Sequence, residues 1–204
     1  MLNIISPGTE PDAAVMRAMF AARKSVFVDL LGWDVPVLDG RYEVDQFDDL
    51  HAHYLILTDD VGAHLASARL LPTMREGILS GLFPMLCDGP PPAAPDIFEI
   101  TRFCLDRRLR ATERRLARDA LVVALADYAL ANAISAYCAV AETGWLRQIL
   151  NFGWQCEQLG AVAEVGGEHL AAVRIDIEPD TPALLAGAGI RASGLPRVSS
   201  QLAA

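Results

Sequence analysis

Two arginines lie inside segments that otherwise read as buried strands, and this feature constrains the fold more than any other. Arg69 lies in an apolar run over 63–71, and Arg102 lies in a second run over 96–105. A charge buried without a partner is strongly destabilising, so each arginine needs a carboxylate from elsewhere in the chain. The fold must therefore gather these groups in a polar site, and charges held in this way are typical of functional sites.

Carboxylates occur in two places that could supply the partners. Glu43, Asp45 and Asp48 precede the first apolar run, and Glu99 stands three residues before Arg102. We expect them to converge with the arginines on one site. Regular alternation along a strand would place Glu99 and Arg102 on opposite faces. A β-bulge would bring them together, and the sequence leaves both arrangements open.

The rest of the chain alternates strands with helices. Strands are predicted at 2–6, 53–59, 63–71, 96–105, 135–142 and 169–177, and helices at 11–30, 76–86, 112–134 and 144–153. This alternation predicts an α/β protein, a three-layer α/β/α sandwich around a mixed sheet. The order of the elements is analogous to that of the N-acyltransferase (GNAT)-like fold. Residues 1–204 are predicted to form a single domain, whose last 25 residues are rich in Gly, Ala and Ser and peripheral.

Charge and composition exclude several classes of protein. The net charge of −9 argues against a nucleic-acid binder. No apolar stretch reaches the ~20 residues of a membrane span, and the N-terminus lacks a signal core. The four cysteines are scattered, which predicts reduced thiols in a cytoplasmic protein and no metal site. A run of basic residues is the exception to the acidic balance: Arg107, Arg108, Arg110, Arg114, Arg115 and Arg118.

Eight charged or aromatic residues stand in an order that resembles the acyl-homoserine-lactone synthases, the LuxI-type autoinducer synthases. They are Arg23, Phe27, Trp33, Asp45, Asp48, Arg69, Glu99 and Arg102. The surrounding motifs match as well, and the resemblance extends over about residues 1–180. It implies transfer of an acyl group from a thioester to the α-amine of S-adenosylmethionine. Lactone closure then releases 5′-methylthioadenosine, and no separate cofactor is implied.

The cosubstrate of this reaction is a cation that also carries a carboxylate, so its pocket needs both signs of charge. Asp45 and Asp48 can hold the ammonium and favour the sulfonium, or they can simply pair with nearby arginines. Both descriptions can be true of a rigid polar wall. Phe27 and Trp33 can stack on the sulfonium and the adenine, or pack the end of a helix onto the sheet. The residues assigned to this pocket are Arg23, Phe27, Trp33, Asp45, Asp48 and Arg69.

Acyl transfer also needs a base that frees the amine. Glu99 is the first choice because it lies on the predicted central strand, and Glu43 is the second. Arg102 is assigned to the catalytic centre as the residue that holds the polar network together, through Glu99 or a neighbouring acid.

The remaining assignments concern the acyl donor. By resemblance, the acyl pocket includes Phe103, Thr143, Trp145 and Leu146. Thr143 matches a position in this family where threonine often accompanies recognition of an oxygen at the acyl C3, or it is a helix N-cap. The arginine run suits acyl carrier protein or acyl-coenzyme A, and carrier protein is favoured as the commoner donor. A general N-acyltransferase acting on another amine is the alternative function, and a non-catalytic binding protein is a third.

Overall fold

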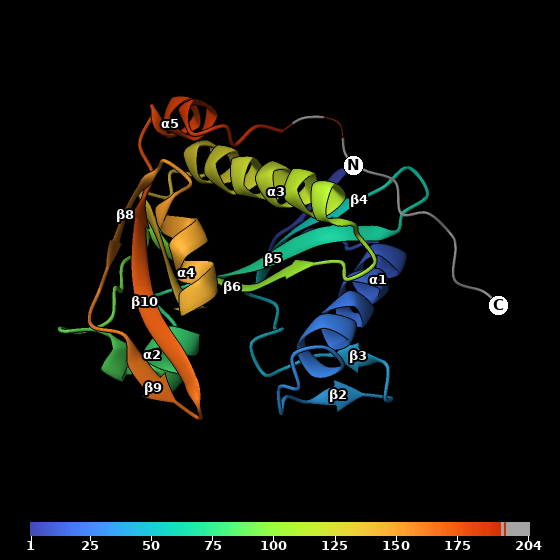
Figure 1. Cartoon of the computed structure of the whole chain (residues 1–204). Helices are drawn as coiled ribbons and strands as arrows, with labels where there is room; N and C mark the ends of the chain where they lie inside the picture. Colours follow the sequence, from blue (N-terminus) through green and yellow to red (C-terminus); the bar gives the residue numbers. More distant parts are fainter. Residues whose placement is uncertain (193, 195–204) are drawn as a thin grey trace. The chain divides into compact units, whose positions relative to one another are not determined.

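The computed structural model describes residues 1–192 and 194, which form two compact units (Figure 1). The first contains Met1–Arg69 and Arg102–Val122, and the second contains Leu70–Thr101 and Val123–Arg191. Strands β5 and β6 and helix α3 each begin in one unit and end in the other. That the whole chain is a single domain stays a prediction.

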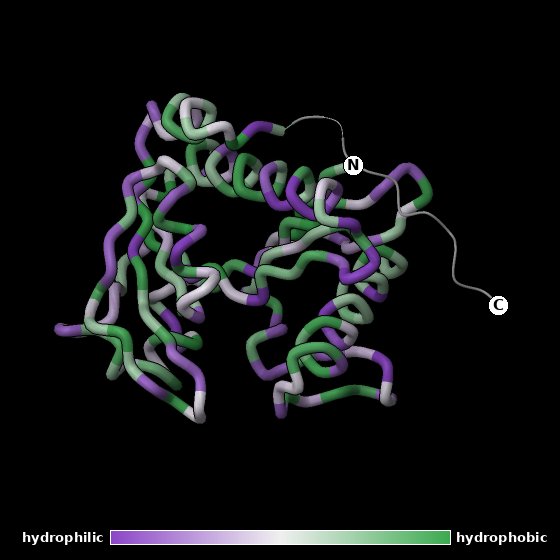
Figure 2. The backbone as a smooth tube through the Cα atoms, viewed as in Figure 1, coloured by the Kyte–Doolittle hydropathy of each residue, from purple (hydrophilic) through white to green (hydrophobic). Residues whose placement is uncertain are grey.

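The first unit pairs antiparallel strands with a helix that ends in a π-helical turn. Its elements are β1 (Leu2–Ile5), α1 (Ala13–Arg23), η1 (Lys24–Val28), β2 (Val37–Leu38), β3 (Tyr42–Glu43), β4 (His53–Thr58), and parts of β5 (His64–Pro72), β6 (Ile97–Leu105) and α3 (Ala111–Ala131). The sheet order here is β1, β4, β5, β6. β2 and β3 form a separate two-stranded ribbon, and β3 contacts α1. Hydrophilic positions gather in the N-terminal half of α3 (Figure 2).

The second unit contains both parallel and antiparallel pairs. Its further elements are α2 (Ile78–Leu82), η2 (Pro84–Leu86), β7 (Ala136–Glu142), α4 (Thr143–Leu150), β8 (Gln155–Gln158), β9 (Ala163–Val165), β10 (Glu168–Asp176) and α5 (Thr181–Gly187). β6 runs parallel to β7, β7 is antiparallel to β10, and β10 also pairs with β8 and β9. Helix α4 packs on β7 and β10.

The mixed sheet with flanking helices confirms the predicted fold class. The predicted helix over 11–30 ends as an α-helix at Arg23 and continues as the π-helical η1, and the one over 76–86 divides into α2 and η2. The short strands β2, β3, β8 and β9 and helix α5 were not predicted. Leu185 of α5 is fully buried, although the chain end was expected to be peripheral; residues 193 and 195–204 lie outside the described part. Among the described helices, none is both long and apolar enough to cross a bilayer.

Candidate active site

Six charged side chains of the first unit form a closed ion-pair network. Each arginine joins two carboxylates and each carboxylate joins two arginines. The order around the network is Arg23, Glu43, Arg102, Asp45, Arg69, Asp48 and back to Arg23. The joining N···O distances lie between 2.5 and 2.9 Å. The acids of 43–48 thus do converge with arginines from a helix and two strands.

The side chains of the network are almost completely buried. The Arg102 side chain is 10% exposed, and none of the other five exceeds 4%. Burial opposes ionisation of Asp48, but hydrogen bonds and charge from Arg23, with the charge of Arg69, lower the pKa of Asp48 to about 2. The carboxylates likewise raise the pKa of Arg23 and of Arg69 against the effect of burial. With three acids and three arginines, the network has no net charge and its members stabilise one another.

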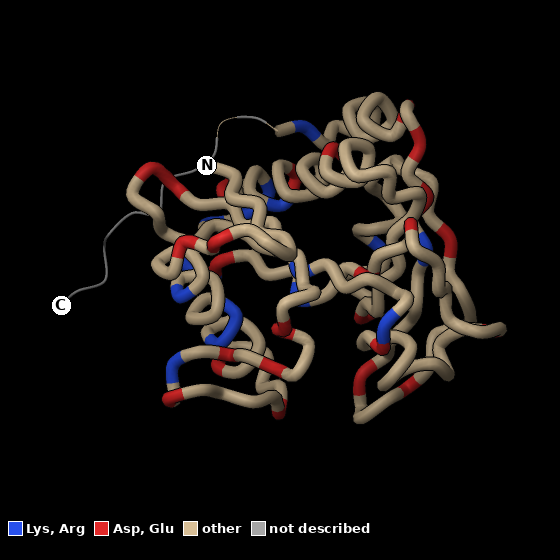
Figure 3. Tube along the Cα trace, turned by 180° about the vertical axis from the view of Figure 1, so that it is seen from behind, with Lys and Arg blue, Asp and Glu red and all other residues tan. Residues whose placement is uncertain are grey.

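Local structure explains how these residues meet. Asp12 caps α1 by accepting hydrogen bonds from the backbone N–H groups of Ala14 and Val15, so the helix starts at a fixed point and ends at Arg23. Arg102 interrupts the extended backbone of β6 with a φ of +48°, which is uncommon for a residue other than glycine. The charged positions of α1 are basic, and acidic positions join them in the segments that follow it (Figure 3).

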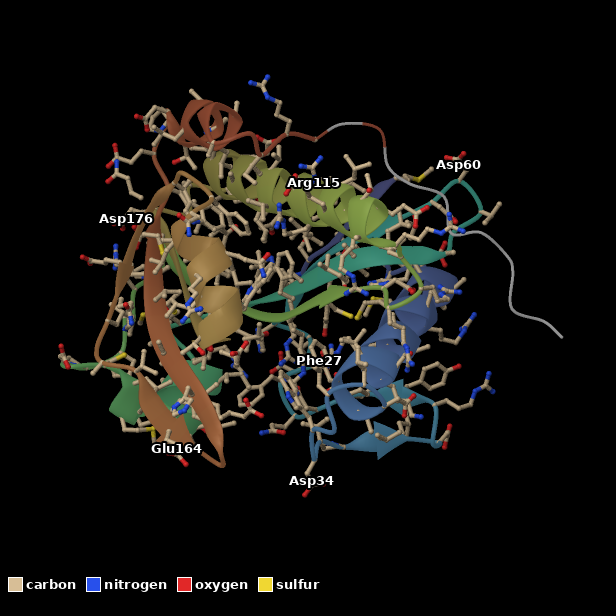
Figure 4. The ribbon with its side chains drawn as sticks, viewed as in Figure 1. Phe27, Asp34, Asp60, Arg115, Glu164 and Asp176 are labelled. Carbon is tan, nitrogen blue, oxygen red and sulfur yellow. The ribbon has the colours of Figure 1, made fainter. Side chains whose placement is uncertain are left out.

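An aromatic pair lies against the network. The rings of Phe27 and Trp33 stack with centroids 4.7 Å apart and planes 13° apart. The π-helical turn carries Phe27 (labelled in Figure 4), whose backbone oxygen accepts a hydrogen bond from Trp33 N at 2.8 Å. The Arg102 guanidinium carbon lies 5.6 Å from the Phe27 centroid and 5.7 Å from the Trp33 centroid. Phe27 is buried whereas Trp33 is 43% exposed, so Trp33 is the ring that a ligand can reach.

Sequence reasoning missed Tyr54, which also contacts the network. Its hydroxyl donates a hydrogen bond of 2.9 Å to Asp48 Oδ1, and its side chain is buried at the start of β4. A tyrosine in an apolar strand needs a partner for its hydroxyl, and this signal could have drawn attention to it.

Glu99, the predicted base, belongs to the second unit and is 3% exposed. Its two carboxylate oxygens accept hydrogen bonds from the backbone N–H groups of Ile78 and Leu79, at 2.9 and 2.8 Å. A side chain at Gly77 would overlap Glu99 Oε2, so glycine permits this close approach. The carboxylate is therefore held in one orientation by the start of α2.

An apolar cluster adjoins Glu99 in the same unit. Leu79 and Leu86 pack with Cys138 of β7 and Ala172 of β10. Cys138 stands opposite Glu99 in the β6–β7 register. The side chains that border this cluster are only partly buried: Phe83, Cys87, Val140, Leu159, Ala163 and Leu170. This arrangement offers apolar surface beside a fixed carboxylate, and the sequence did not predict these residues.

Of the predicted acyl-pocket residues, three lie on α4. Leu146 is buried, and Trp145 packs edge-on against Phe152 at 5.9 Å. The proposal that Thr143 is an N-cap is wrong, because Glu142 caps α4 by accepting a hydrogen bond from Gly144 N at 2.8 Å. The fourth residue, Phe103, is partly buried on β6 in the first unit.

The six residues of the arginine run differ in the groups that they contact. Arg108 makes two hydrogen bonds to Asp106, at 2.8 and 2.9 Å, and Arg118 is paired with Asp119 at 2.6 Å. Arg114 donates to the backbone oxygen of Asp106, and Arg107 to that of Ser25, both at 3.4 Å. Three members are exposed and form no ion pair among the described residues: Arg107, Arg110 and Arg115. Of these, Arg115 is labelled in Figure 4.

Comparison with solved structures identifies the fold first. A putative N-acetyltransferase from Lactobacillus plantarum is 19% identical to this chain, with a TM-score of 0.59; the likeness covers 87% of this chain and 99% of that one. At that identity the similarity concerns the fold alone. The fold is that of the GNAT-like N-acyltransferases.

Closer relatives then define the family. A family model described as autoinducer synthase matches residues 9–183. An acyl-homoserine-lactone synthase of Ralstonia nicotianae is 32% identical over 192 residues, covering 91% of this chain and 93% of the relative. The solved structure of BjaI, a CoA-dependent acyl-homoserine lactone synthase with SAM and isopentyl-CoA, is 28% identical with a TM-score of 0.83, covering 99% of this chain and 95% of that one. The chain therefore belongs to the autoinducer synthase family and is an acyltransferase.

Proposed function

We propose that this protein transfers an acyl group from a thioester to the α-amine of S-adenosylmethionine and then releases 5′-methylthioadenosine as the lactone closes. The observation that carries the proposal is the closed ion-pair network beside the stacked Phe27 and Trp33. A ligand with an ammonium, a sulfonium and a carboxylate needs fixed partners of both signs and an aromatic surface. The relative BjaI, whose structure holds SAM and an acyl-CoA, supports the same substrates here.

In this proposal the network positions the cosubstrate more than it attracts it. Asp45 and Asp48 are already paired with arginines, so they act as the fixed wall of the pocket. Arg102, the most exposed member, donates to the cosubstrate's carboxylate. Trp33 offers its exposed surface to the adenine or the sulfonium, with Phe27 behind it.

Glu99 remains the preferred base, acting directly on the ammonium or through a water. Its carboxylate oxygens accept hydrogen bonds from the backbone N–H groups at the start of α2, which hold the carboxylate in one orientation, and it is not among the acids whose ion pairs define the network. Glu43 is a poor base in comparison. It is fully buried, and Arg23 and Arg102 occupy its two oxygens. We assign Glu43 a positioning role instead.

The released amine attacks the thioester carbonyl, and collapse of the tetrahedral intermediate expels the thiol and leaves an amide. The tethered carboxylate then attacks the carbon that bears the sulfonium, which breaks that C–S bond and frees methylthioadenosine. No further nucleophile is required, because a folded substrate supplies a high effective molarity. The partly buried apolar side chains beside Glu99, notably Phe83 and Val140, suit the acyl chain, together with Leu146 and Trp145 of α4.

For the donor we propose acyl-coenzyme A, against the expectation from sequence that favoured carrier protein. Two relatives solved as CoA-dependent synthases, BjaI and MesI, each have a TM-score of 0.83 to this chain. The exposed Arg107, Arg110 and Arg115 suit the phosphates of coenzyme A. The four cysteines are free thiols, which supports a cytoplasmic location where these substrates occur.

One incubation tests the function. The protein is given S-adenosylmethionine and a panel of acyl thioesters, and methylthioadenosine, free thiol and lactone are measured by mass spectrometry. We expect all three in equal amounts. Free thiol without methylthioadenosine would indicate a general N-acyltransferase, and none of the three would indicate a binding protein.

A variant pair links the activity to the site. Trp33→Leu removes an exposed ring, and the loss of a cation–π contact of about 0.5–2 kcal/mol predicts a KM for S-adenosylmethionine raised by about 2- to 30-fold. Glu164→Gln changes an exposed residue of β9 and should leave KM unchanged. Comparison of coenzyme-A and carrier-protein thioesters with one acyl chain then identifies the donor.

A further inference from the structure

Tyr54 completes the coordination of one oxygen of the ion-pair network. Asp48 Oδ1 lies 2.9 Å from the Tyr54 hydroxyl, 2.8 Å from Arg23 Nη1 and 2.9 Å from Arg69 Nη1. The tyrosine is the only uncharged side chain among these three donors. Burial raises the pKa of Tyr54, and the negative charge of Asp48 raises it further, so the hydroxyl keeps the proton that it donates.

The aromatic ring of Tyr54 supports the network from a second direction. It packs edge-on against Phe20 of α1, with centroids 6.4 Å apart and planes at 76°. The Phe20 ring in turn lies 5.1 Å from the guanidinium carbon of Arg23. Tyr54 and Phe20 therefore form an aromatic layer behind the Arg23–Asp48 ion pair.

The orientation of Asp48 matters because its other oxygen holds the backbone of Asp45. Asp48 Oδ2 accepts hydrogen bonds from Asp45 N at 2.9 Å and from Arg23 Nη2 at 2.8 Å. Asp45 in turn binds Arg69 and Arg102. A shift of Asp48 would thus move the acid that connects the two strand arginines.

We propose that Tyr54 is a positioning residue for the cosubstrate site and acts through Asp48. This inference rests on the proposed function, since it concerns the binding of S-adenosylmethionine. The hydroxyl fixes the rotamer of Asp48, and the fixed carboxylate keeps the wall of the pocket in one arrangement before the ligand arrives.

The test is Tyr54→Phe, which removes one oxygen and keeps the ring against Phe20. We expect the KM for S-adenosylmethionine to rise by about 3- to 10-fold, in line with the loss of one buried hydrogen bond. The KM for the acyl thioester should not change, and kcat should stay within about twofold. Calorimetric titration with S-adenosylmethionine should show the same weakening without any turnover.

Tyr137→Phe is the matched control. Tyr137 is fully buried in the second unit, and its hydroxyl donates to the backbone oxygen of Leu125 at 3.0 Å. Both substitutions remove a buried tyrosine hydroxyl and should lower Tm, but only Tyr54→Phe should change the KM for S-adenosylmethionine. An unchanged KM and unchanged calorimetric affinity in Tyr54→Phe would overturn the inference, as would an equal rise of both KM values. Failure of the wild-type protein to release methylthioadenosine would instead refute the proposed function.

Discussion

Glu43→Gln is the substitution that tests the ion-pair network most directly. Glu43 is fully buried; its Oε2 accepts from Arg23 Nε at 2.5 Å, and its Oε1 accepts from Arg102 at 2.9 and 3.1 Å. Glutamine keeps the shape but loses the charge. Whichever way its amide turns, an NH₂ group must face one of the two guanidinium groups.

The expected loss of stability is large for so small a change. Removing one partner of a buried ion pair typically costs about 3–5 kcal/mol. Arg23 keeps Asp48 and Arg102 keeps Asp45, so we expect the lower end, about 3 kcal/mol. For a chain of this size that loss corresponds to a Tm lowered by about 6–12 °C.

Unfolding in guanidinium chloride at pH 7, followed by circular dichroism, measures this quantity. Glu164→Gln is the control, because that carboxylate is exposed and its loss should change stability by no more than about 0.5 kcal/mol. A loss below about 1 kcal/mol for Glu43→Gln would refute the account of a buried, closed ion-pair network. The pH–rate profile of Glu43→Gln, measured per folded molecule, adds a second result. If the variant folds well but its profile loses the acid limb, Glu43 and not Glu99 is the base.

Three further predictions concern other members of the site. Arg102→Ala breaks two ion pairs of the network at its most exposed arginine, so steady-state kinetics should show a KM for S-adenosylmethionine raised at least tenfold. A variant that folds normally and keeps full turnover would contradict the role of Arg102. Gly77→Ala should displace the Glu99 carboxylate and lower the rate of methylthioadenosine release at least tenfold, whereas an unchanged rate would remove Glu99 as the base. Asp48 has its pKa lowered from 3.8 to about 2, so its contribution of about 2 kcal/mol is present above pH 4 and is lost as the pH falls toward 2. Unfolding free energies measured across that interval should decrease, and Asp48→Asn should flatten the curve.

Sequence reasoning succeeded where a local pattern has one physical solution. The strands predicted at 53–59 and 63–71 are the observed β4 and β5, and Asp59 forms the turn between them by accepting hydrogen bonds from Val61 N and Ala63 N. The need of Arg69 and Arg102 for carboxylate partners was equally predictable, because a buried guanidinium leaves few alternatives.

The missed features depend on contacts between distant parts of the chain. β8 has mostly exposed polar residues and is a strand only because it pairs with β10, so no apolar alternation marks it. The π-helical turn that carries Phe27 and the positive φ of Arg102 arise in segments whose composition fits ordinary helix and strand. Backbone irregularities of this kind are set by tertiary packing and are common beside functional sites.

The closed network also explains why residue identities were easier to predict than residue roles. The need of buried charges for partners predicted Arg69, Arg102 and the acids of 43–48, whereas Arg23 was assigned from the family resemblance. In the structure each of the three acids pairs with two arginines. A role depends instead on which member a ligand can reach, and that depends on burial. Glu43 and Glu99 are both carboxylates in apolar surroundings, yet two guanidinium groups occupy the first whereas backbone N–H groups hold the second. A ligand could reach the Glu43 carboxylate only by displacing one of its two guanidinium partners, which is why we propose Glu99 as the base.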